Sequence, residues 1–324
     1  MPSPAAYVKR LARAYCLGLV CCAGLTHAAP PATCPPTAQM PSQEQMMAGL
    51  RDTQDRGVLW RIAKDGRNSY LYGTLHVGRQ DWIYPGPALQ RALQQTAVLA
   101  LELDVTDPAV QAVMTEPTPA AQLPVIGPAL QRRLDGQAAL ACLPPGALAS
   151  MHPVLQVMTY ALLAGRWDGL DPSYGQEFVL AGYAKAGQRP LISLETAEGQ
   201  RDALIPKTPA EALEATEQAL ELLEGQRVRP QLKRLAEAWA RGDLAELAAY
   251  EDWCDCIKNE ADRRAMRRLN DERNPAMAER IAALHAQGEP LLAAVGALHM
   301  TGPQALPRLL AERGFTVERV EPHK

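Results

Sequence analysis

Two histidines occur in the same short sequence context in distant parts of the chain. Residues 72–77 read YGTLHV and residues 295–300 read VGALHM, so His76 and His299 each end a Gly-x-x-His motif. Histidine can bind a metal, accept a proton or donate one near neutral pH. A lone histidine of this kind is more often structural, but two at equivalent positions favour a shared functional site.

The similarity continues beyond the two motifs. Residues 88–93 (ALQRAL) match 305–310 (ALPRLL), and the segments 98–103 and 315–320 then follow without a gap. Both copies therefore predict a strand, a Gly-x-x-His turn, a helix and a second strand. Sites in open α/β sheets form beyond the carboxyl ends of the strands. If the two copies are neighbours in the sheet, His76 and His299 face one crevice.

Acidic residues follow two of the predicted strands. Glu102 interrupts an apolar run, and a buried carboxylate is costly unless it is paired or binds a metal. Asp104 is two residues further on and is expected on the same strand face. Glu195 closes a second apolar run. A structural salt bridge or helix cap is the alternative role for each acid.

The residue types leave two kinds of chemistry open. Two histidines with a carboxylate are a common ligand set for zinc, manganese or iron, and such a metal can activate water for hydrolysis. Without a metal, the same groups could do acid–base work, with histidine as the base and glutamate orienting it. We find no serine nucleophile elbow, dinucleotide fingerprint or phosphate loop. Residues 175–177 (GQE) carry no recognisable motif.

Hydrophobic periodicity predicts an α/β (α+β) fold. We expect a central, mostly parallel sheet built from the two strand–GxxH–helix–strand repeats, with a large helical insertion at about 205–290. The expected strands are 58–62, 69–75, 98–105, 189–194, 291–295 and 316–320. The expected helices include 88–96, 153–164, 176–186 and 305–313. These elements form a single domain, 58–324, after a flexible leader at 29–57.

Residues 1–28 have the layout of a secretory signal peptide. Lys9, Arg10 and Arg13 precede an apolar stretch at 14–25, and Thr26-His27-Ala28 resembles a cleavage site. A membrane anchor would need about 20 apolar residues. A lipoprotein is disfavoured because Cys21 occupies the place of a small residue before Cys22. The sequence therefore predicts a periplasmic or secreted protein with no transmembrane anchor after cleavage.

Charge and cysteine content agree with export. The formal charge of −3 becomes −6 when the three leader cations are removed, which gives no support to nucleic-acid binding. Outside the expected signal peptide, Cys34, Cys142, Cys254 and Cys256 allow two disulfides in three pairings. Cys254 and Cys256 are too close in sequence for a zinc knuckle. We expect the four to be structural rather than metal-binding or redox-active.

Together these motifs resemble the TraB/GumN family, which is related to the TIKI metalloproteases and, more distantly, to erythromycin-esterase-like and ChaN-like proteins. The resemblance covers about 59–320. Besides Gln200, it depends on residues 59–62 (LWRI), 70–76 (YLYGTLH), 101–104 (LELD), 169–171 (GLD), 194–196 (LET), 273–277 (RNPAM) and 295–302 (VGALHMTG).

The resemblance implies a sheet-based fold and, in its TIKI branch, a divalent-metal protease. His76, Glu102 and His299 would be the metal ligands, with manganese, zinc or cobalt as the ion. Arg273 would bind an acidic substrate or an oxyanion, and Glu195 would be a second acid. The expected substrate is a peptide or another small molecule. The alternative is a non-catalytic periplasmic binding or accessory protein that holds a metal, haem or peptide in the same crevice.

Overall fold

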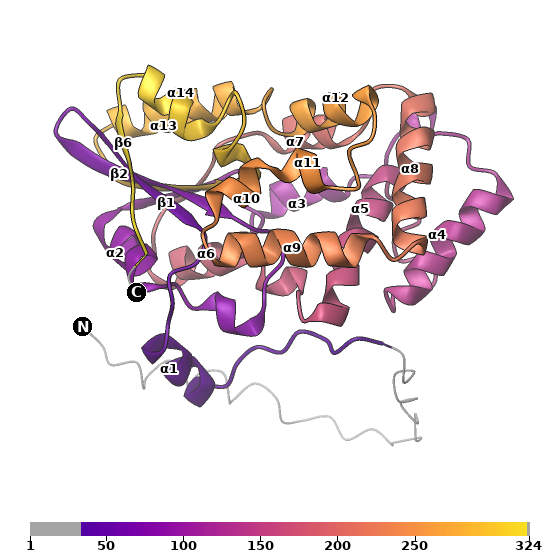
Figure 1. Cartoon of the computed structure of the whole chain (residues 1–324), viewed down its shortest axis with the longest axis horizontal. Coiled ribbons are helices and arrows are strands. Elements are labelled where there is room, and N and C mark those ends of the chain that lie inside the picture. The colour runs from indigo at the N-terminus through magenta and orange to yellow at the C-terminus, as the bar shows by residue number, and fades with distance from the viewer. Residues whose placement is uncertain (1–33, 323–324) are drawn as a thin grey trace, which may run out of the picture. The chain divides into compact units, whose positions relative to one another are not determined.

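One six-stranded sheet organises the chain, with strand order β4-β3-β5-β2-β1-β6. The structure, a computed structural model, describes residues 34–322 (Figure 1), so the expected signal peptide lies outside the described residues. The strands are β1 Val58–Lys64, β2 Arg67–Thr74, β3 Val98–Leu101, β4 Leu191–Ser193, β5 Leu291–Gly296 and β6 Thr316–Arg319. The four strands from β4 to β2 are parallel, whereas β1 is antiparallel to both β2 and β6. The predicted α/β class with a mostly parallel sheet is confirmed.

The two strands that lead into the Gly-x-x-His motifs are neighbours. β2 and β5 pair in parallel, with Gly73 opposite Val295 and Thr74 opposite Gly296. A Cβ on Gly73 would lie 2.7 Å from Val58 Cγ2 and 3.2 Å from Ala297 Cα, so a side chain would not fit there. Both motifs therefore leave the sheet side by side at the same edge, which is the condition on which the expected shared site depended.

Some helices cover the two faces of the sheet, and others pack on one another beside it. Their bounds are α1 Gln43–Arg51, α2 Pro87–Gln95, α3 Pro108–Thr115, α4 Pro128–Leu140, α5 Pro153–Ala164, α6 Gln176–Ala186, α7 Ala197–Leu204, α8 Pro209–Glu224, α9 Val228–Ala240, α10 Leu244–Ala248, α11 Tyr250–Trp253, α12 Glu260–Leu269, α13 Asn274–Ala286 and α14 Leu306–Glu312. Short 3₁₀ turns include η2 Gln80–Ile83, η3 Ala120–Gln122, η4 Gly165–Asp168, η5 Pro172–Tyr174 and η6 Ala297–Met300. The predicted helices 153–164 and 176–186 coincide with α5 and α6.

Both faces of the sheet are buried. Alternate residues of β2 point to opposite faces, so Tyr70 and Tyr72 pack with α2, α6 and α9, whereas Leu71 packs with α13 and α14. Figure 1 shows α13 and α14 along one face of the sheet. A third apolar cluster joins α4, α5 and α8 at the end of the molecule away from β6 (Figure 1).

Two local expectations differ from the structure. Strand β3 ends at Leu101 and not at residue 105, because the Asp104 carboxylate accepts hydrogen bonds from the backbone N–H and the hydroxyl of Thr106 and so forms a turn. Glu102 and Asp104 therefore do not share a strand face. Helix α1 lies within the segment expected to be a flexible leader, and Ser42 and Gln45 form its capping box.

Among residues 34–322, no helix combines the length and the apolar character that crossing a bilayer requires.

Candidate active site

The two motif histidines lie in different environments although their strands are neighbours. His76 follows the end of β2, and its side chain is 60% exposed. His299 belongs to η6, directly after β5, and its side chain is 5% exposed. Sequence-equivalent positions therefore have unequal access to solvent.

Glu177 is the partner of His76. Its Oε1 lies 3.2 Å from His76 Nδ1 and accepts a hydrogen bond of 2.5 Å from the Thr74 hydroxyl. Glu177 belongs to the first turn of α6. The start of this helix lies close against the first motif: a Cβ on Gly175 would come within 2.7 Å of the His76 carbonyl oxygen, so only glycine fits there. The Glu177 carboxylate is buried and makes His76 a positioned cation rather than a free surface side chain.

Electrostatics hold the proton on His76. The negative charge of Glu177 outweighs the effect of burial and raises the pKa of His76 to about 9. Burial raises the pKa of Glu177, but the His76 charge and its hydrogen bond lower it overall. At neutral pH the pair is an imidazolium and a carboxylate.

Glu177 is a residue that the sequence analysis missed. We found no motif at 175–177, yet these residues place the acid against the first Gly-x-x-His turn. The available signal was an acidic residue two positions after a glycine, in the first turn of a helix that is otherwise largely apolar. Its partner could not be identified from that signal, because His76 is distant in sequence.

Arg273 joins the two carboxylates that follow the neighbouring strands β3 and β4. Its Nε donates to Glu195 Oε1 at 3.0 Å, and its Nη2 donates both to Glu195 Oε2 and, at 2.5 Å, to Glu102 Oε2. Glu102 also accepts from the Gly296 backbone N–H at 2.7 Å and from Gln200 Nε2 at 3.0 Å. The Glu102 and Arg273 side chains are 7% and 12% exposed, so this is a buried ion cluster.

The charges of this cluster stabilise one another. Burial raises the pKa of Glu102, but the opposing influence of His299 and Arg273 lowers it to about 2. Burial lowers the pKa of Arg273, but its hydrogen bond to Glu195 and the charge of Glu102 raise it overall. Burial lowers the pKa of His299 to about 4, so His299 is neutral at pH 7 and Arg273 is the main counterion of the Glu102 carboxylate.

Asn274 fixes the orientation and the tautomer of His299. The amide nitrogen of Asn274 donates to the backbone carbonyls of His299, at 3.2 Å, and Gln304, at 2.8 Å. Its amide oxygen therefore faces His299 Nδ1, at 2.6 Å, and accepts the proton on that nitrogen. His299 Nε2 is left as an acceptor, 3.3 Å from Arg273 Nη1 and 3.9 Å from Glu102 Oε1. Burial lowers the pKa of His299 to about 4, although Glu102 opposes it.

The environments of the two histidines therefore push their pKa values apart. At neutral pH, His76 carries a proton that it can donate, and His299 has a lone pair that can accept one. The charge of His76 also lowers the pKa of both Glu102 and His299, so the His76–Glu177 pair and the Arg273 cluster influence each other electrostatically. The arrangement suits paired acid and base chemistry.

The residues expected to bind a metal are brought to one region but not into a ligand cluster. Within residues 34–322, no group of three His, Cys, Asp or Glu side chains is arranged to hold a metal ion. Glu177 holds His76, and the Arg273 guanidinium lies beside Glu102 and His299. In this arrangement the side chains do not form a metal centre, because Glu177 and Arg273 occupy the positions beside them.

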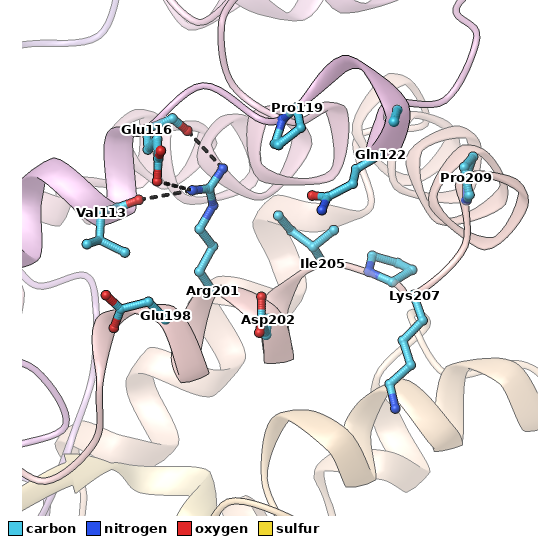
Figure 2. Close-up of a pocket in the computed structure, with 12 residues that line it drawn as sticks. Val113, Glu116, Pro119, Gln122, Glu198, Arg201, Asp202, Ile205, Lys207 and Pro209 are labelled. Atoms are coloured by element: carbon cyan, nitrogen blue, oxygen red, sulfur yellow. Dashed lines mark hydrogen bonds and ion pairs between the residues drawn. The ribbon is translucent and has the colours of Figure 1, made fainter.

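The hollow of about 510 Å³ shown in Figure 2 lies away from these residues. It is lined by segments of α3, η3 and α7, and Arg201 points across it to the backbone oxygens of Val113 and Glu116. Gln200, on the same helix, contacts Glu102 of the ion cluster instead. None of the residues that line this hollow belongs to the acid–base cluster.

Replacing Glu177 by Gln removes the charge that keeps His76 protonated. We expect the pKa of His76 to fall from about 9 toward its ordinary value of 6.5, as measured by NMR titration of the imidazole resonances in chelator-treated protein. Glu198→Gln, on the α7 face that lines the separate hollow, is the matched control and leaves the titration unchanged. A parent His76 that titrates near 6.5 would contradict the ion pair.

Replacing Arg273 by Met leaves Glu102 and Glu195 without their cation. At pH 7 we expect the free energy of unfolding to fall by about 3–5 kcal/mol, the usual cost of removing one partner from a buried ion pair. The added exchanges Glu102→Gln and Glu195→Gln should restore most of it. The exposed Arg308→Met, which breaks a surface pair with Glu312, should cost less than about 1 kcal/mol.

The pH dependence of the Arg273→Met effect checks its cause. The depressed pKa of Glu102 stabilises the parent above its ordinary pKa of 4.5, and this contribution is lost as the pH falls through about 2. In the variant, the buried Glu102 carboxyl is easier to protonate because its cation is gone, so the loss of stability should be smaller at pH 5 than at pH 7. Urea unfolding at both pH values measures it, and a pH-independent loss would point to packing instead.

Comparison with known proteins adds a family match over most of the chain. The model of the TraB/PrgY/gumN family matches residues 58–319, which include both Gly-x-x-His motifs and every member of the acid–base cluster. Neither the curated proteins nor the solved structures contain a match.

Proposed function

We propose that this chain, which belongs to the TraB/PrgY/gumN family, is an exported hydrolase that uses His76 and His299 as an acid–base pair. The observation that carries the proposal is the opposite protonation of these two sequence-equivalent histidines beside one buried ion cluster. The family match by itself gives no reaction. The proposal therefore depends on the geometry and charge of the site.

His76 is the proposed acid. Its Nδ1 is held by Glu177, so Nε2 is the nitrogen left to meet a substrate, and the exposed ring is accessible to one. A protonated imidazole can stabilise a developing oxyanion and can give its proton to a leaving group. Glu177 keeps the ring oriented and charged throughout.

His299 is the proposed base. Its Nε2 lone pair, which faces Arg273 Nη1 at 3.3 Å, would take a proton from the attacking water once Arg273 turns toward the substrate, and the nearby Glu102 carboxylate would stabilise the resulting imidazolium. The Arg273 guanidinium would then stabilise negative charge that develops on the substrate. The overall reaction adds water across an acyl bond: hydroxide goes to the carbonyl carbon, and the proton goes through the histidines to the leaving group.

The pH dependence of hydrolysis tests these assignments. With a pool of fluorogenic peptides and simple esters, we expect a bell-shaped rate profile. Activity is lost below a pKa of about 4, where His299 becomes protonated, and above about 9, where His76 loses its proton. His76→Ala and His299→Ala should each reduce the rate by about 10²–10⁴-fold, while Glu198→Gln retains it.

Circular dichroism of the variants separates loss of chemistry from loss of folding. Parental rates in folded His76→Ala would overturn the acid role. Binding of a peptide without turnover would favour the alternative, a non-catalytic periplasmic binding or accessory protein for a metal, haem or peptide.

Divalent-metal binding by His76, Glu102 and His299 is a second candidate. It is supported by the way Glu177 and Asn274 hold the Nδ1 atoms of the two rings, because metal-binding histidines are commonly anchored through the other nitrogen. It would require His76 to lose its proton and Arg273 to move away from His299. A bound metal would supply Lewis acidity.

Metal content decides between the two candidates. Expressing cells should be grown with manganese, zinc or cobalt in separate trials, and the protein should be recovered from the periplasm without a His-tag. Its intact mass reports whether residues 1–28 have been removed. A stoichiometric metal that is lost in the double variant His76→Ala/His299→Ala would establish the metal site. Full activity after metal removal would support the acid–base pair.

A further inference from the structure

Cys254 and Cys256 form a disulfide that closes a very short loop. The two cysteines are two residues apart, between the end of α11 and the start of α12. A disulfide stabilises a fold mainly by restricting the unfolded chain, and the stabilisation grows with the length of the loop that the disulfide closes. A loop this short gives little such stabilisation. The structural role that we expected from the sequence therefore does not account for this bond.

The two sulfur atoms differ in access. Cys254 is 5% exposed, whereas Cys256 is half-buried. Both cysteines line a hollow of about 230 Å³, but of the two only Cys256 also lines a second hollow of about 160 Å³. Thiol–disulfide exchange begins when a thiolate attacks one sulfur and releases the other. The geometry makes Cys256 the sulfur that is attacked and Cys254 the one that leaves.

Groups around Cys254 suit the reduced state. The Tyr250 hydroxyl lies 3.3 Å from Cys254 Sγ and 3.4 Å from Cys256 Sγ, and burial raises the pKa of Tyr250 to about 12, so it keeps its proton. It can therefore donate to a Cys254 thiolate as the disulfide opens. The backbone N–H of Cys256, 3.4 Å from Cys254 Sγ, is a second donor.

Gln231 offers an acceptor that only the thiol form can satisfy. Its amide nitrogen donates to the Arg227 carbonyl at 2.8 Å, so its amide oxygen is the atom that lies 3.0 Å from Cys254 Sγ. A disulfide sulfur has no proton to donate, whereas the Cys254 thiol does. Reduction therefore adds a hydrogen bond at this position.

The larger of the two hollows is suited to a polypeptide substrate. It lies between α5 and α9 beside the disulfide and is lined mostly by apolar side chains, among them Met158, Leu162, Leu232 and Leu235. Met158 is 37% exposed, so the apolar lining reaches the surface. An extended segment with apolar side chains could lie here with its cysteine next to Cys256.

We propose that Cys254–Cys256 is a redox-active disulfide that oxidises pairs of thiols in cysteine-containing polypeptides. A substrate thiolate attacks Cys256 Sγ, the bond between the two sulfurs breaks, and Cys254 leaves as a thiolate that Tyr250 stabilises. The second substrate thiolate then attacks the substrate sulfur of the mixed disulfide and releases Cys256. The substrate gains a disulfide, and the chain gains two electrons and two protons as a dithiol. A low-molecular-weight disulfide such as oxidised glutathione re-oxidises it.

A single-turnover experiment tests the activity directly. The oxidised protein is mixed without oxygen with a reduced peptide that carries two cysteines flanked by leucines, and mass spectrometry follows both partners. We expect one peptide disulfide per protein, and none with Cys254→Ser/Cys256→Ser. Tyr250→Phe should slow the exchange by about 10-fold, as for one lost hydrogen bond, while Tyr183→Phe on α6 leaves the rate unchanged. His76→Ala should react at the parental rate, which separates this activity from hydrolysis.

Two further variants test the direction of attack and the docking site. Cys254→Ser should accumulate a stable mixed disulfide with the disulfide-linked dimer of a single-cysteine peptide, which releases one peptide as a free thiol, whereas Cys256→Ser should not, because its remaining cysteine is buried. Met158→Gln should weaken the reaction with the apolar peptide but not with dithiothreitol.

Three results would overturn the proposal. They are a disulfide that excess peptide dithiol does not reduce, equal trapping by both single-cysteine variants, and reduction that unfolds the protein as the loss of a structural disulfide would.

Discussion

The buried Arg273 guanidinium is the interaction on which the rest of the site depends. Arg273 is the N-cap residue of α13 and is hydrogen-bonded to Glu102 and Glu195, which follow the adjacent strands β3 and β4. Two carboxylates withdrawn from water would repel each other and lose their hydration. One cation between them makes their burial possible, and it ties the carboxyl end of the sheet to the helix that packs across its face.

The same cluster explains why two copies of one motif differ chemically. His299 lies beside Arg273, is withdrawn from water and has its Nδ1 proton bound by an amide oxygen, so it stays neutral. The His76 side chain is largely exposed and has the Glu177 carboxylate as its partner, so it stays charged. A repeat that supplied two equal histidines has thus produced an unequal pair, which is what proton transfer requires.

The helical layer beside the sheet has a chemical feature of its own. The Cys254–Cys256 loop lies between α11 and α12 and contacts α9 through Gln231. Its hydrogen-bond partners Tyr250 and Gln231 are not members of the acid–base cluster. Its surroundings include a phenol, an amide oxygen and an apolar hollow. The helical insertion is therefore more than a support for the sheet, and the two regions can be studied separately.

The sequence alone determined the features that depend on local pattern. Hydrophobic periodicity predicted α5 and α6 at their observed bounds, and the repeat predicted a strand before each Gly-x-x-His motif, because side-chain spacing and turn chemistry act over a few residues. That these two strands are neighbours is shown by the sheet. It also identified Glu102, Glu195 and Arg273 as candidates, although not as partners of one another.

Tertiary structure decided which groups meet and in which charge state. Glu177 reaches His76 only because α6 packs on the first motif, and Asn274 fixes His299 only because α13 crosses beside η6. These contacts join residues far apart in the chain, and burial and neighbouring charges then set each pKa. No local pattern carries that information.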